Sequence, residues 1–233
     1  MIQLKGLVKN YGLNPILKGV NLHVKDQDFV ALVGPNGAGK TTILRIVATL
    51  LRPDGGKATV GGWSLPHEAE HVRKHIGMIS HQAMVYSDLN AIDNLTYYAG
   101  MYGLDDPEER IMDLLTTVGL KRRVYDPVRT YSRGMMQRLA IARATLHNPD
   151  VLLMDEPYTG LDQPAVALLN DLLAQQNEAG RTILMITHDF VHGLSQCKKV
   201  VVLNKGKIAA EINRSSVSTG ELIEQYREIT KVD

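Results

Sequence analysis

The chain has few of the features that mark secreted, membrane-spanning or nucleic-acid-binding proteins. Its single cysteine, Cys197, excludes an internal disulfide and fits a reducing compartment. No apolar run approaches the roughly 18 residues that span a bilayer, and the first residues lack the charged-then-apolar order of a signal peptide. The 26 basic and 25 acidic residues give a formal charge of +1, so no basic field points to a nucleic acid. We therefore expect a soluble protein that does not insert into a membrane and has no nucleic-acid partner.

The 233 residues contain no internal repeat, low-complexity segment or linker, which predicts one domain over residues 1–233. Near the N-terminus, Ile2 to Lys9 and Val20 to Val24 resemble strands at the edge of an antiparallel sheet. From Ala91 to about Leu146 the strand pattern disappears. Three helical stretches follow one another there, starting near Ala91, Pro107 and Ser132. This region predicts a helical subdomain inserted over about residues 85–147.

Strand and helix patterns alternate again in the last third of the chain. The alternation begins with a predicted strand over Val151–Met154 and includes a predicted strand over Val200–Asn204. Residues 189–195 are predicted to form one of its helices. The alternation predicts a mainly parallel sheet with helices on both faces. Ser218 and Glu221 form a capping-box pattern, which predicts a short docked helix over about residues 218–231. The expected fold class is α/β.

The stretch Gly34 to Thr41 reads GPNGAGKT and has the spacing of a phosphate-binding loop. Residues 29–33 before it form an apolar run suited to a buried strand, and Thr42 to Leu51 after it have helical spacing. Glycines let backbone N–H groups close around a phosphate, and the helix directs its positive end at the same anion. Lys40 adds a cation, and the Thr41 hydroxyl is able to ligate Mg²⁺. This stretch predicts binding of a nucleoside triphosphate.

A second stretch, Val151 to Pro157, reads VLLMDEP and delivers two carboxylates to the C-terminal end of a strand. In a parallel sheet this is where ligands bind. We expect Asp155 to hold Mg²⁺ and Glu156 to polarise a water for attack on the γ-phosphate. By itself, the stretch fits equally well a strand that ends in solvated acids.

Taken together with the segment YSRGMMQRLAIARA at Tyr131 to Ala144, these stretches resemble the ATP-binding cassette (ABC) family over essentially the whole chain. In that family two cassettes face each other head to tail, and each ATP lies between the phosphate loop of one and the signature segment of the other. The resemblance implies a P-loop ATPase with ATP and Mg²⁺ as ligands. It assigns nucleotide contacts to Tyr11, Gly34, Pro35, Asn36, Gly37, Ala38, Gly39, Lys40, Thr41, Thr42, Ser132, Gly134 and Asp162.

Six residues receive individual roles by residue-by-residue match. Tyr11 is placed to stack on adenine, and Gln82 lies at the loop that senses Mg²⁺, the water and the partner subunit. Ser132, with Gly134, corresponds to the signature that reaches the γ-phosphate across the dimer. Asp162 matches the loop that communicates between the two sites, and His188 matches the switch histidine. The implied metal positions are Thr41, Gln82 and Asp155, and the implied catalytic positions are Lys40, Gln82, Glu156 and His188.

Each match has a structural alternative. Tyr11 fits a surface aromatic, Gln82 a loop amide, Asp162 a helix N-cap and His188 a polar strand end. The order and spacing of the signals along one chain favour the family roles. One departure concerns the signature, which begins Tyr-Ser-Arg-Gly here and Leu-Ser-Gly-Gly in the family's usual form. Arg133 therefore either points away from the nucleotide or adds a cation beside it.

His67, Glu68 and His71 spell the HExxH pattern of zinc peptidases. A helix starting near Pro66 would place both histidines on one face. A catalytic zinc needs a third protein ligand, and the sequence identifies none. A solvated helix is the preferred interpretation.

The function that the resemblance implies is the separate ATPase subunit of a membrane transporter. Its partners would be a second cassette and a transmembrane permease, and it would lie in the cytoplasm on the inner face of the membrane. The segment Ile79 to Tyr102 is most similar to export-type cassettes, among them the ATP-binding subunit of the haem exporter of cytochrome c maturation. Two alternatives are a soluble cassette ATPase of DNA repair or translation, and a monomeric P-loop kinase or GTPase. The chain shows no coiled-coil insertion, second cassette or guanine-binding Asn-Lys-x-Asp motif.

Overall fold

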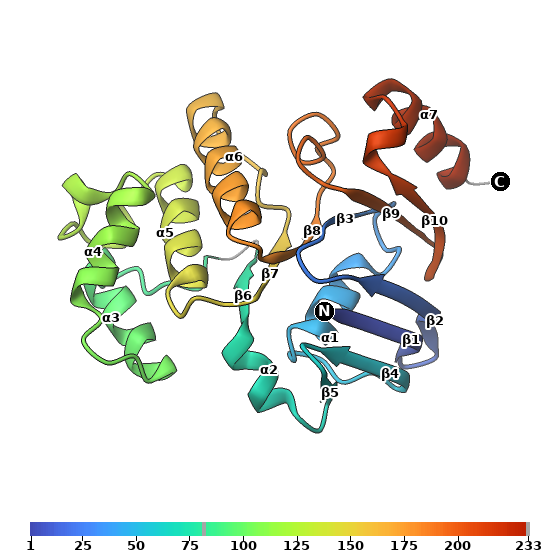
Figure 1. The fold of residues 1–233 in the computed structure, drawn as a ribbon, viewed down its shortest axis with the longest axis horizontal. Helices are drawn as coiled ribbons and strands as arrows, with labels where there is room; N and C mark the ends of the chain where they lie inside the picture. The colour runs from blue at the N-terminus through green and yellow to red at the C-terminus, as the bar shows by residue number, and fades with distance from the viewer. Residues whose placement is uncertain (81–82, 232–233) are drawn as a thin grey trace.

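The computed structural model describes residues 1–80 and 83–231, and it is built around two sheets (Figure 1). The smaller sheet is antiparallel and has the order β2-β1-β4-β5. Its strands are β1 (Ile2–Tyr11), β2 (Asn14–Val24), β4 (Gly55–Val60) and β5 (Trp63–Leu65). The expected N-terminal antiparallel subdomain is therefore confirmed, and the strands β4 and β5 that follow the phosphate loop complete it.

The larger sheet has six strands in the order β10-β9-β3-β8-β7-β6. They are β3 (Phe29–Val33), β6 (Ile76–Ile79), β7 (Val151–Asp155), β8 (Thr182–Ile186), β9 (Lys199–Asn204) and β10 (Lys207–Asn213). Five strands are parallel, and β10 pairs antiparallel to β9 at one edge. Strand β3 lies between β8 and β9, with Val30 opposite Leu184 and Lys199. The predicted mainly parallel sheet is confirmed.

Alternate residues of the parallel strands face two separate hydrophobic cores, as the two-residue period of a strand requires. Phe29, Ala31 and Val33 of β3 belong to a core shared with the helices α3 to α7. Val30 and Leu32 face the other core, which is shared with α1 and the antiparallel sheet. Both faces of the parallel sheet are therefore covered, which explains its continuous apolar strands.

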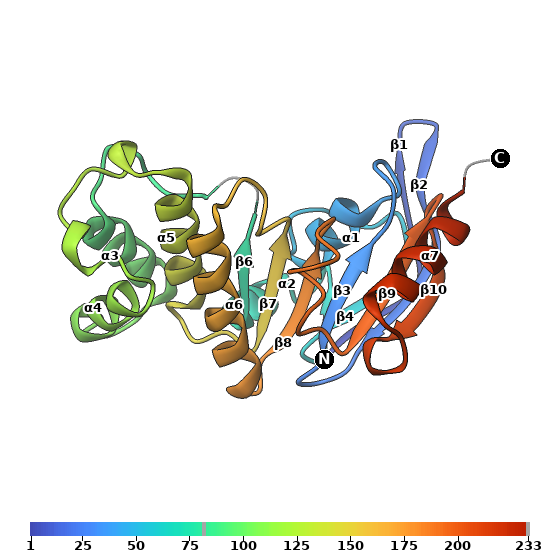
Figure 2. The same cartoon turned by 90° about the horizontal axis from the view of Figure 1, so that it is seen from above.

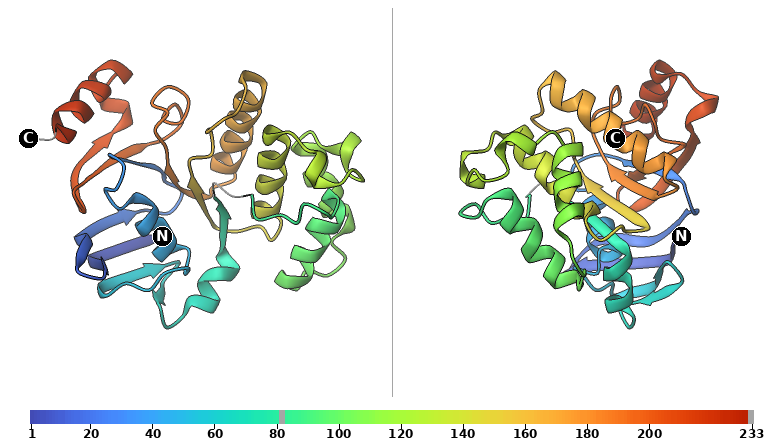
Figure 3. Two further views of the ribbon diagram at one scale, coloured as in Figure 1. Left: turned by 180° about the vertical axis from the view of Figure 1, so that it is seen from behind. Right: turned by 60° about the vertical axis from the view of Figure 1, so that its left-hand side comes forward.

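The helices of the first core begin with α3 (Ala91–Tyr102), α4 (Glu108–Thr117) and α5 (Arg133–Thr145). They lie beyond the β6 edge of the parallel sheet, at the opposite end of the molecule from the antiparallel sheet and α7 (Figures 2 and 3). This core also includes α6 (Gln163–Glu178) and α7 (Thr219–Thr230), the latter with the predicted capping box between Ser218 and Glu221. The remaining helices are α1 (Lys40–Val47), α2 (Ala69–His75) and the short 3₁₀ turns Lys121–Arg123, Val128–Thr130 and Arg214–Ser216.

Two predicted boundaries and one predicted helix were wrong. Helix α1 starts at Lys40 and ends at Val47, whereas Thr42 to Leu51 was expected, because Thr49 adopts a positive φ of 64° that ends the helix. Strand β2 begins at Asn14, before the predicted Val20, and it pairs with β1 through irregular register steps that interrupt the alternation. Residues 189–195 form turns in place of a helix. The Asp189 carboxylate accepts backbone N–H groups at 191 and 192, which closes a single turn.

Candidate functional site

The site begins where β3 ends and the chain turns through the predicted phosphate loop into α1. Gly34 has a φ of 155°, and a β-carbon there would collide with the carbonyl oxygen of Leu203 in β9. Gly39 has a φ of 107°, and its β-carbon would come within 2.7 Å of Leu17. Only glycine fits both positions, because the loop is pressed against β9 and β2. The glycines of the motif thus shape the loop that leads to Lys40.

The Lys40 ammonium lies inside this loop. Its Nζ donates hydrogen bonds to the carbonyl oxygens of Gly34 (2.7 Å) and Pro35 (3.0 Å). Burial lowers the pKa of Lys40, and the nearby carboxylates of Glu156 and Asp155 oppose that shift. The loop therefore holds a largely buried cation, directed at the position where the sequence predicts a phosphate.

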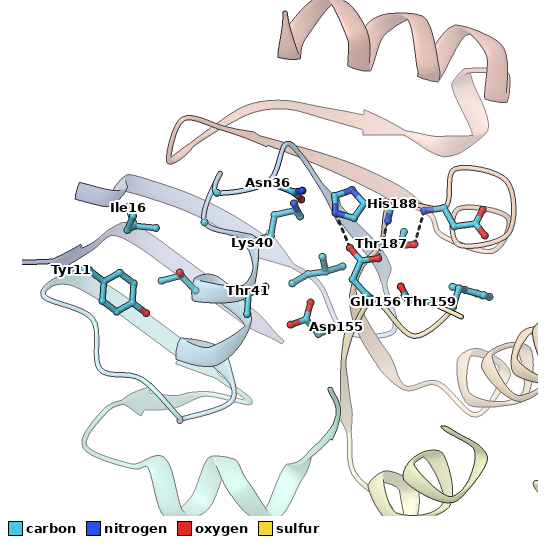
Figure 4. A pocket seen from close by; sticks show the side chains of 16 residues that line it. Tyr11, Ile16, Asn36, Lys40, Thr41, Asp155, Glu156, Thr159, Thr187 and His188 are labelled. Carbon is cyan, nitrogen blue, oxygen red and sulfur yellow. Dashed lines mark hydrogen bonds and ion pairs between the residues drawn. The ribbon is translucent and has the colours of Figure 1, made fainter. Parts of the chain in front are cut away.

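Around this loop lies a cavity of about 980 Å³, large enough for a nucleotide. Figure 4 shows Lys40, Thr41, Asp155 and Glu156 around one part of the cavity, with Tyr11 and Ile16 farther along it. Tyr11 ends β1, and its side chain is 47% exposed. The lining residues that the sequence had predicted are Tyr11, Asn36, Gly37, Gly39, Lys40, Thr41, Thr42, Asp155, Glu156 and His188.

Glu156 is held in an unusual backbone conformation at the end of β7. Its φ is 54°, which is uncommon for a residue with a side chain, and its N–H donates to the carbonyl oxygen of Ile186 at 2.9 Å. The carboxylate meets His188 twice. Its Oε1 lies 3.1 Å from Nε2 of His188, and its Oε2 accepts the backbone N–H of His188 at 3.2 Å. The residue after β7 and the second residue after β8 are thus joined by these two contacts.

Six of the predicted and described site residues do not line this cavity: Gly34, Pro35 and Ala38 of the phosphate loop, and Ser132, Gly134 and Asp162. Ser132 is the N-cap of α5 and accepts the N–H of Met135 at 3.2 Å, and Gly134 follows in the first turn. Asp162 is the N-cap of α6 and accepts the N–H of Ala165 at 3.0 Å. Within one chain these residues have capping positions, as the structural alternative for Asp162 had proposed. The remaining predicted site residue, Gln82, lies outside the described residues.

The cavity also includes residues that sequence reasoning missed. They are Ile16, Tyr158, Thr159, Ile186, Thr187 and Asp189. Except for Ile16, they all lie within three residues of the predicted Glu156 or His188, so the ends of β7 and β8 were a usable signal for them. Ile16 gave no such signal. It comes into the cavity because β2 starts earlier than expected and pairs back along β1 next to Tyr11.

The HExxH pattern does not form a zinc site. Helix α2 begins at Ala69, so His67 precedes it and the two histidines do not share a helical face. The ring of His71 stacks on Trp63 with 6.0 Å between centroids, and Glu68 accepts the N–H of Ser64 at 2.7 Å. Over residues 1–80 and 83–231, no group of three or more His, Cys, Asp or Glu side chains is arranged to hold a metal ion.

In this parallel sheet the GxxxxGKT loop follows β3, and the paired acids lie at the end of β7, which is separated from β3 by β8. This arrangement defines a P-loop nucleoside triphosphatase. The family model for the ABC transporter matches residues 17–159. The chain belongs to this family as an ATP-binding subunit, and ABC cassettes are ATPases. Among the described residues, no helix has the length and apolar character needed to cross a membrane.

Two relatives from bacteria illustrate the family match. The chain is 33% identical to the linearmycin resistance ATP-binding protein LnrL of Bacillus subtilis over 90% of its own length and 68% of that protein. It is 35% identical to the Nod factor export ATP-binding protein I of Cupriavidus metallidurans, over 91% of this chain and 70% of that protein. Both relatives are therefore longer than the sequence described here.

Solved structures support the same assignment. One is described as the ATP-binding subunit of an ABC transporter. It matches with a TM-score of 0.90 and 30% identity over 99% of this chain and 100% of the other. A second is the dimeric, post-hydrolysis state of the ATP-binding cassette MJ0796 bound to ADP and Pi. It matches with a TM-score of 0.84 and 28% identity, over 92% of this chain and 99% of the other.

Proposed function

We propose that the chain supplies ATP hydrolysis to an exporter, as one of two cassettes that bind ATP between them. The observation that carries the proposal is the contact between Glu156 and His188 beside Lys40, at the phosphate end of the cavity. It supports a role for this carboxylate next to the expected position of the γ-phosphate. The names of the relatives in export and resistance support the direction of transport.

At the other end of the cavity, Tyr11 receives the adenine ring. A half-exposed aromatic ring at a cavity mouth offers a face for stacking, and stacking makes little demand on hydrogen bonding. Ile16 adds an apolar contact to the same end. Between the two ends, the loop from Gly34 to Thr42 surrounds the phosphates with backbone N–H groups, and Lys40 exchanges its carbonyl partners for phosphate oxygens.

The donor set beside the phosphate loop fits Mg²⁺. Thr41 offers a hydroxyl and Asp155 a carboxylate on the cavity wall, and Mg²⁺ prefers oxygen ligands of this kind together with phosphate and water. When bound, the ion neutralises charge that develops on the transferred phosphoryl group. Gln82 is the third proposed ligand position.

Glu156 acts as the general base in this proposal. Its carboxylate accepts a proton from the attacking water while the water oxygen bonds to the γ-phosphorus and the bond from that phosphorus to the ADP oxygen breaks. His188 orients the carboxylate through its Nε2 and contacts the γ-phosphate. Glu156→Gln keeps the shape and removes the base, so hydrolysis should fall by at least about 10²-fold while nucleotide still binds. Wild-type hydrolysis by this variant would show that another group activates the water.

The second cassette supplies Ser132 and Gly134 in this proposal. Both lie at the exposed start of α5, away from the cavity of their own chain, and a solved neighbour is a dimer with ADP and Pi. Asp162, at the start of α6, lies in the loop through which the two sites communicate. Because ATP contacts both chains, it must promote dimerisation by linkage.

A dimerisation experiment tests this arrangement. We expect Glu156→Gln with saturating Mg-ATP to run as a homodimer in size-exclusion chromatography with light scattering, and without nucleotide as a monomer at micromolar concentration. Adding Ser132→Arg places bulk and charge against the partner's phosphate, and it should abolish the dimer while ATP binding to the single chain persists. A monomer under all conditions would refute the homodimer, and a dimer unaffected by Ser132→Arg would refute the trans role of the signature.

An exposed patch of methionine and tyrosine side chains supports a permease partner. It consists of Met84, Tyr86, Tyr97 and Met101, which are 41%, 46%, 46% and 66% exposed. Tyr86 and Tyr97 meet edge to face with 5.1 Å between ring centroids, and Met101 lies one helical turn beyond Tyr97 on α3. Adjacent exposed Met and aromatic side chains of this kind mark protein-interaction surfaces. We propose that this patch binds the cytoplasmic face of the permease.

Purification of the native membrane complex tests the partner. We expect the tagged chain to co-purify with a transmembrane permease, and the double variant Tyr97→Ser/Met101→Ser to lose that permease while it retains ATP binding. Co-purification with a ribosome or a repair complex in place of a membrane protein would favour the soluble-ATPase alternative.

A further inference from the structure

The signature segment and the loop after Glu156 touch each other within this chain, through Arg133 and Gly160. Arg133 is the first residue of α5, and Gly160 lies in the loop between β7 and α6. A β-carbon built on Gly160 would lie 2.6 Å from Cζ of Arg133 and 2.7 Å from its Nε and Nη1. The guanidinium group therefore rests flat against the bare α-carbon of Gly160.

This contact accounts for the position of the Arg133 side chain. The residue is exposed, and in the described part of the chain its guanidinium has no hydrogen bond and no ion pair. A planar, weakly hydrated guanidinium packs well on peptide surface, whereas an ammonium does not. Gly160 has a φ of 73°, so a residue with a side chain would be strained there as well as obstructed. The arginine and the glycine thus form a matched pair.

The loop that Arg133 touches is linked by local hydrogen bonds to Glu156. The N–H of Thr159 donates to the carbonyl oxygen of Glu156 at 3.2 Å, and the N–H of Leu161 donates to that of Tyr158 at 3.2 Å. The Tyr158 hydroxyl donates to Asn170 of α6 at 2.7 Å, which fixes one side of the loop. The other side, at Gly160, is exposed, and there the guanidinium contacts the loop.

Helices α5 and α6 lie side by side in both Figure 1 and Figure 2. Their first turns are close, because a β-carbon on Gly134 would come within 3.4 Å of that of Ala165. A shift of the signature segment relative to α6 therefore moves the guanidinium across Gly160. Only the two turns closed by the N–H groups of Thr159 and Leu161 separate this contact from Glu156.

We propose that Arg133 is a positioning residue for hydrolysis, whose guanidinium ties the start of α5 to the loop that carries Glu156. The proposal rests on the general-base role proposed above for Glu156. It differs from the other interpretation of Arg133, in which the charge reaches the partner's nucleotide. The contact holds the Glu156 carboxylate at the position from which it accepts a proton from the attacking water.

A double-mutant cycle on ATP hydrolysis by the full chain tests the contact. We expect Arg133→Ala to lower kcat by roughly tenfold, since small displacements of a catalytic group cost that much or more. Gly160→Ala should lower kcat by at least as much, because its β-carbon displaces the guanidinium. The double variant should be no slower than Gly160→Ala within about twofold. The Kd for ATP should stay within about twofold of wild type in all three, since none of them touches the phosphate loop.

Two further variants separate the contact from strain and from charge. Gly180→Ala carries the same strain at a φ of 76°, but its nearest neighbour is a Gln27 side-chain atom at an ordinary 3.5 Å, so kcat should be unchanged. Arg133→Lys keeps the charge and loses the planar group, and it should behave like Arg133→Ala. Thermal melts of each variant confirm folding.

Several outcomes would overturn the proposal. One is a double variant whose fold-loss in kcat equals the product of the two single fold-losses. Others are a wild-type kcat for Arg133→Lys or for Arg133→Ala. The last is a loss of kcat in Gly180→Ala equal to that in Gly160→Ala. Glu156→Gln in the same assay separates the two proposals. If that variant is inactive while the cycle is multiplicative, only the role of Arg133 fails. If it hydrolyses ATP at the wild-type rate, the general-base role itself fails.

Discussion

The half-buried imidazole of His147 should make the protein lose stability in mild acid. Its Nε2 donates to the carbonyl oxygen of Ile76 at 3.0 Å, and its ring stacks on Tyr102 with 3.8 Å between centroids. Its Nδ1 is buried and has no hydrogen-bond partner among the described residues, so a second proton there would be unsatisfied. Burial lowers the pKa of His147 from 6.5 to about 4. The hydrogen bond to Ile76 opposes this shift, and the guanidinium groups of Arg143, Arg110 and Arg181 add to it.

The size and sign of the effect follow from that pKa. Between pH 6.5 and pH 4 the unfolded chain binds a proton at residue 147 and the folded chain does not, so acid favours unfolding. Each pH unit in this window costs up to about 1.4 kcal/mol of unfolding free energy. The loss from His147 is thus about 2 kcal/mol between pH 7 and pH 5, and about 3 kcal/mol by pH 4. Above about pH 7.5 this contribution is constant.

Urea unfolding of wild type and His147→Gln from pH 7 to pH 4 measures the effect. Glutamine keeps an N–H for the Ile76 carbonyl and does not titrate, so the gap in stability between the two proteins should shrink or reverse as the pH falls. The exposed His67, changed to Gln, is the matched control for the loss of an imidazole. Parallel pH profiles for wild type and His147→Gln would refute the reasoning.

Three further predictions concern the nucleotide site and the sheet beside it. Tyr11→Ala should weaken ATP binding by ~1–3 kcal/mol, with Tyr11→Phe near wild type in the same titration, and an unchanged affinity would remove the ring from the site. Lys40→Ala should reduce both ATP affinity and turnover, because the cation contacts phosphate before and during the reaction; a loss of turnover alone would contradict this. Gly77→Ala should destabilise the fold by about 1–3 kcal/mol in urea, since its β-carbon would collide with the carbonyl oxygen of Ala144. Gly100→Ala, inside α3 with open space around it, should instead stabilise by up to ~1 kcal/mol, and equal effects of the two changes would refute the packing argument.

The phosphate end of the site could be predicted from the sequence because its chemistry is local. The spacing from Gly34 to Thr41 and the acids at Asp155 and Glu156 each follow an apolar strand, and parallel strands bring their carboxyl ends to one edge. His188, which the family resemblance had matched to the switch histidine, lies just after β8 and lines the same cavity. Each of these residues is positioned mainly by its own strand.

Other parts depended on contacts between distant segments, and no local pattern recorded them. Ile16 enters the cavity through the irregular pairing of β2 with β1. Residues 189–195 carry a helix-like pattern, yet Gly193 packs so close to Thr187 that a β-carbon there would lie 2.7 Å from the threonine hydroxyl. The contact of Arg133 with Gly160 joins two segments that lie far apart in the chain, so no local sequence pattern indicates it. Tertiary packing decides such positions, and propensity does not.

The central place of β3 in the sheet has a consequence for how the protein is made. The hairpin of β1 and β2 can form as soon as it leaves the ribosome, because both strands lie within the first 24 residues. Both neighbours of β3 are encoded about 150 residues later, at Thr182–Ile186 and Lys199–Asn204. At typical rates of translation this delay is on the order of 10–30 s. During that time the apolar strand that carries the phosphate loop has no partner in the sheet, and a nascent chain that ends before β8 has no formed ATP site.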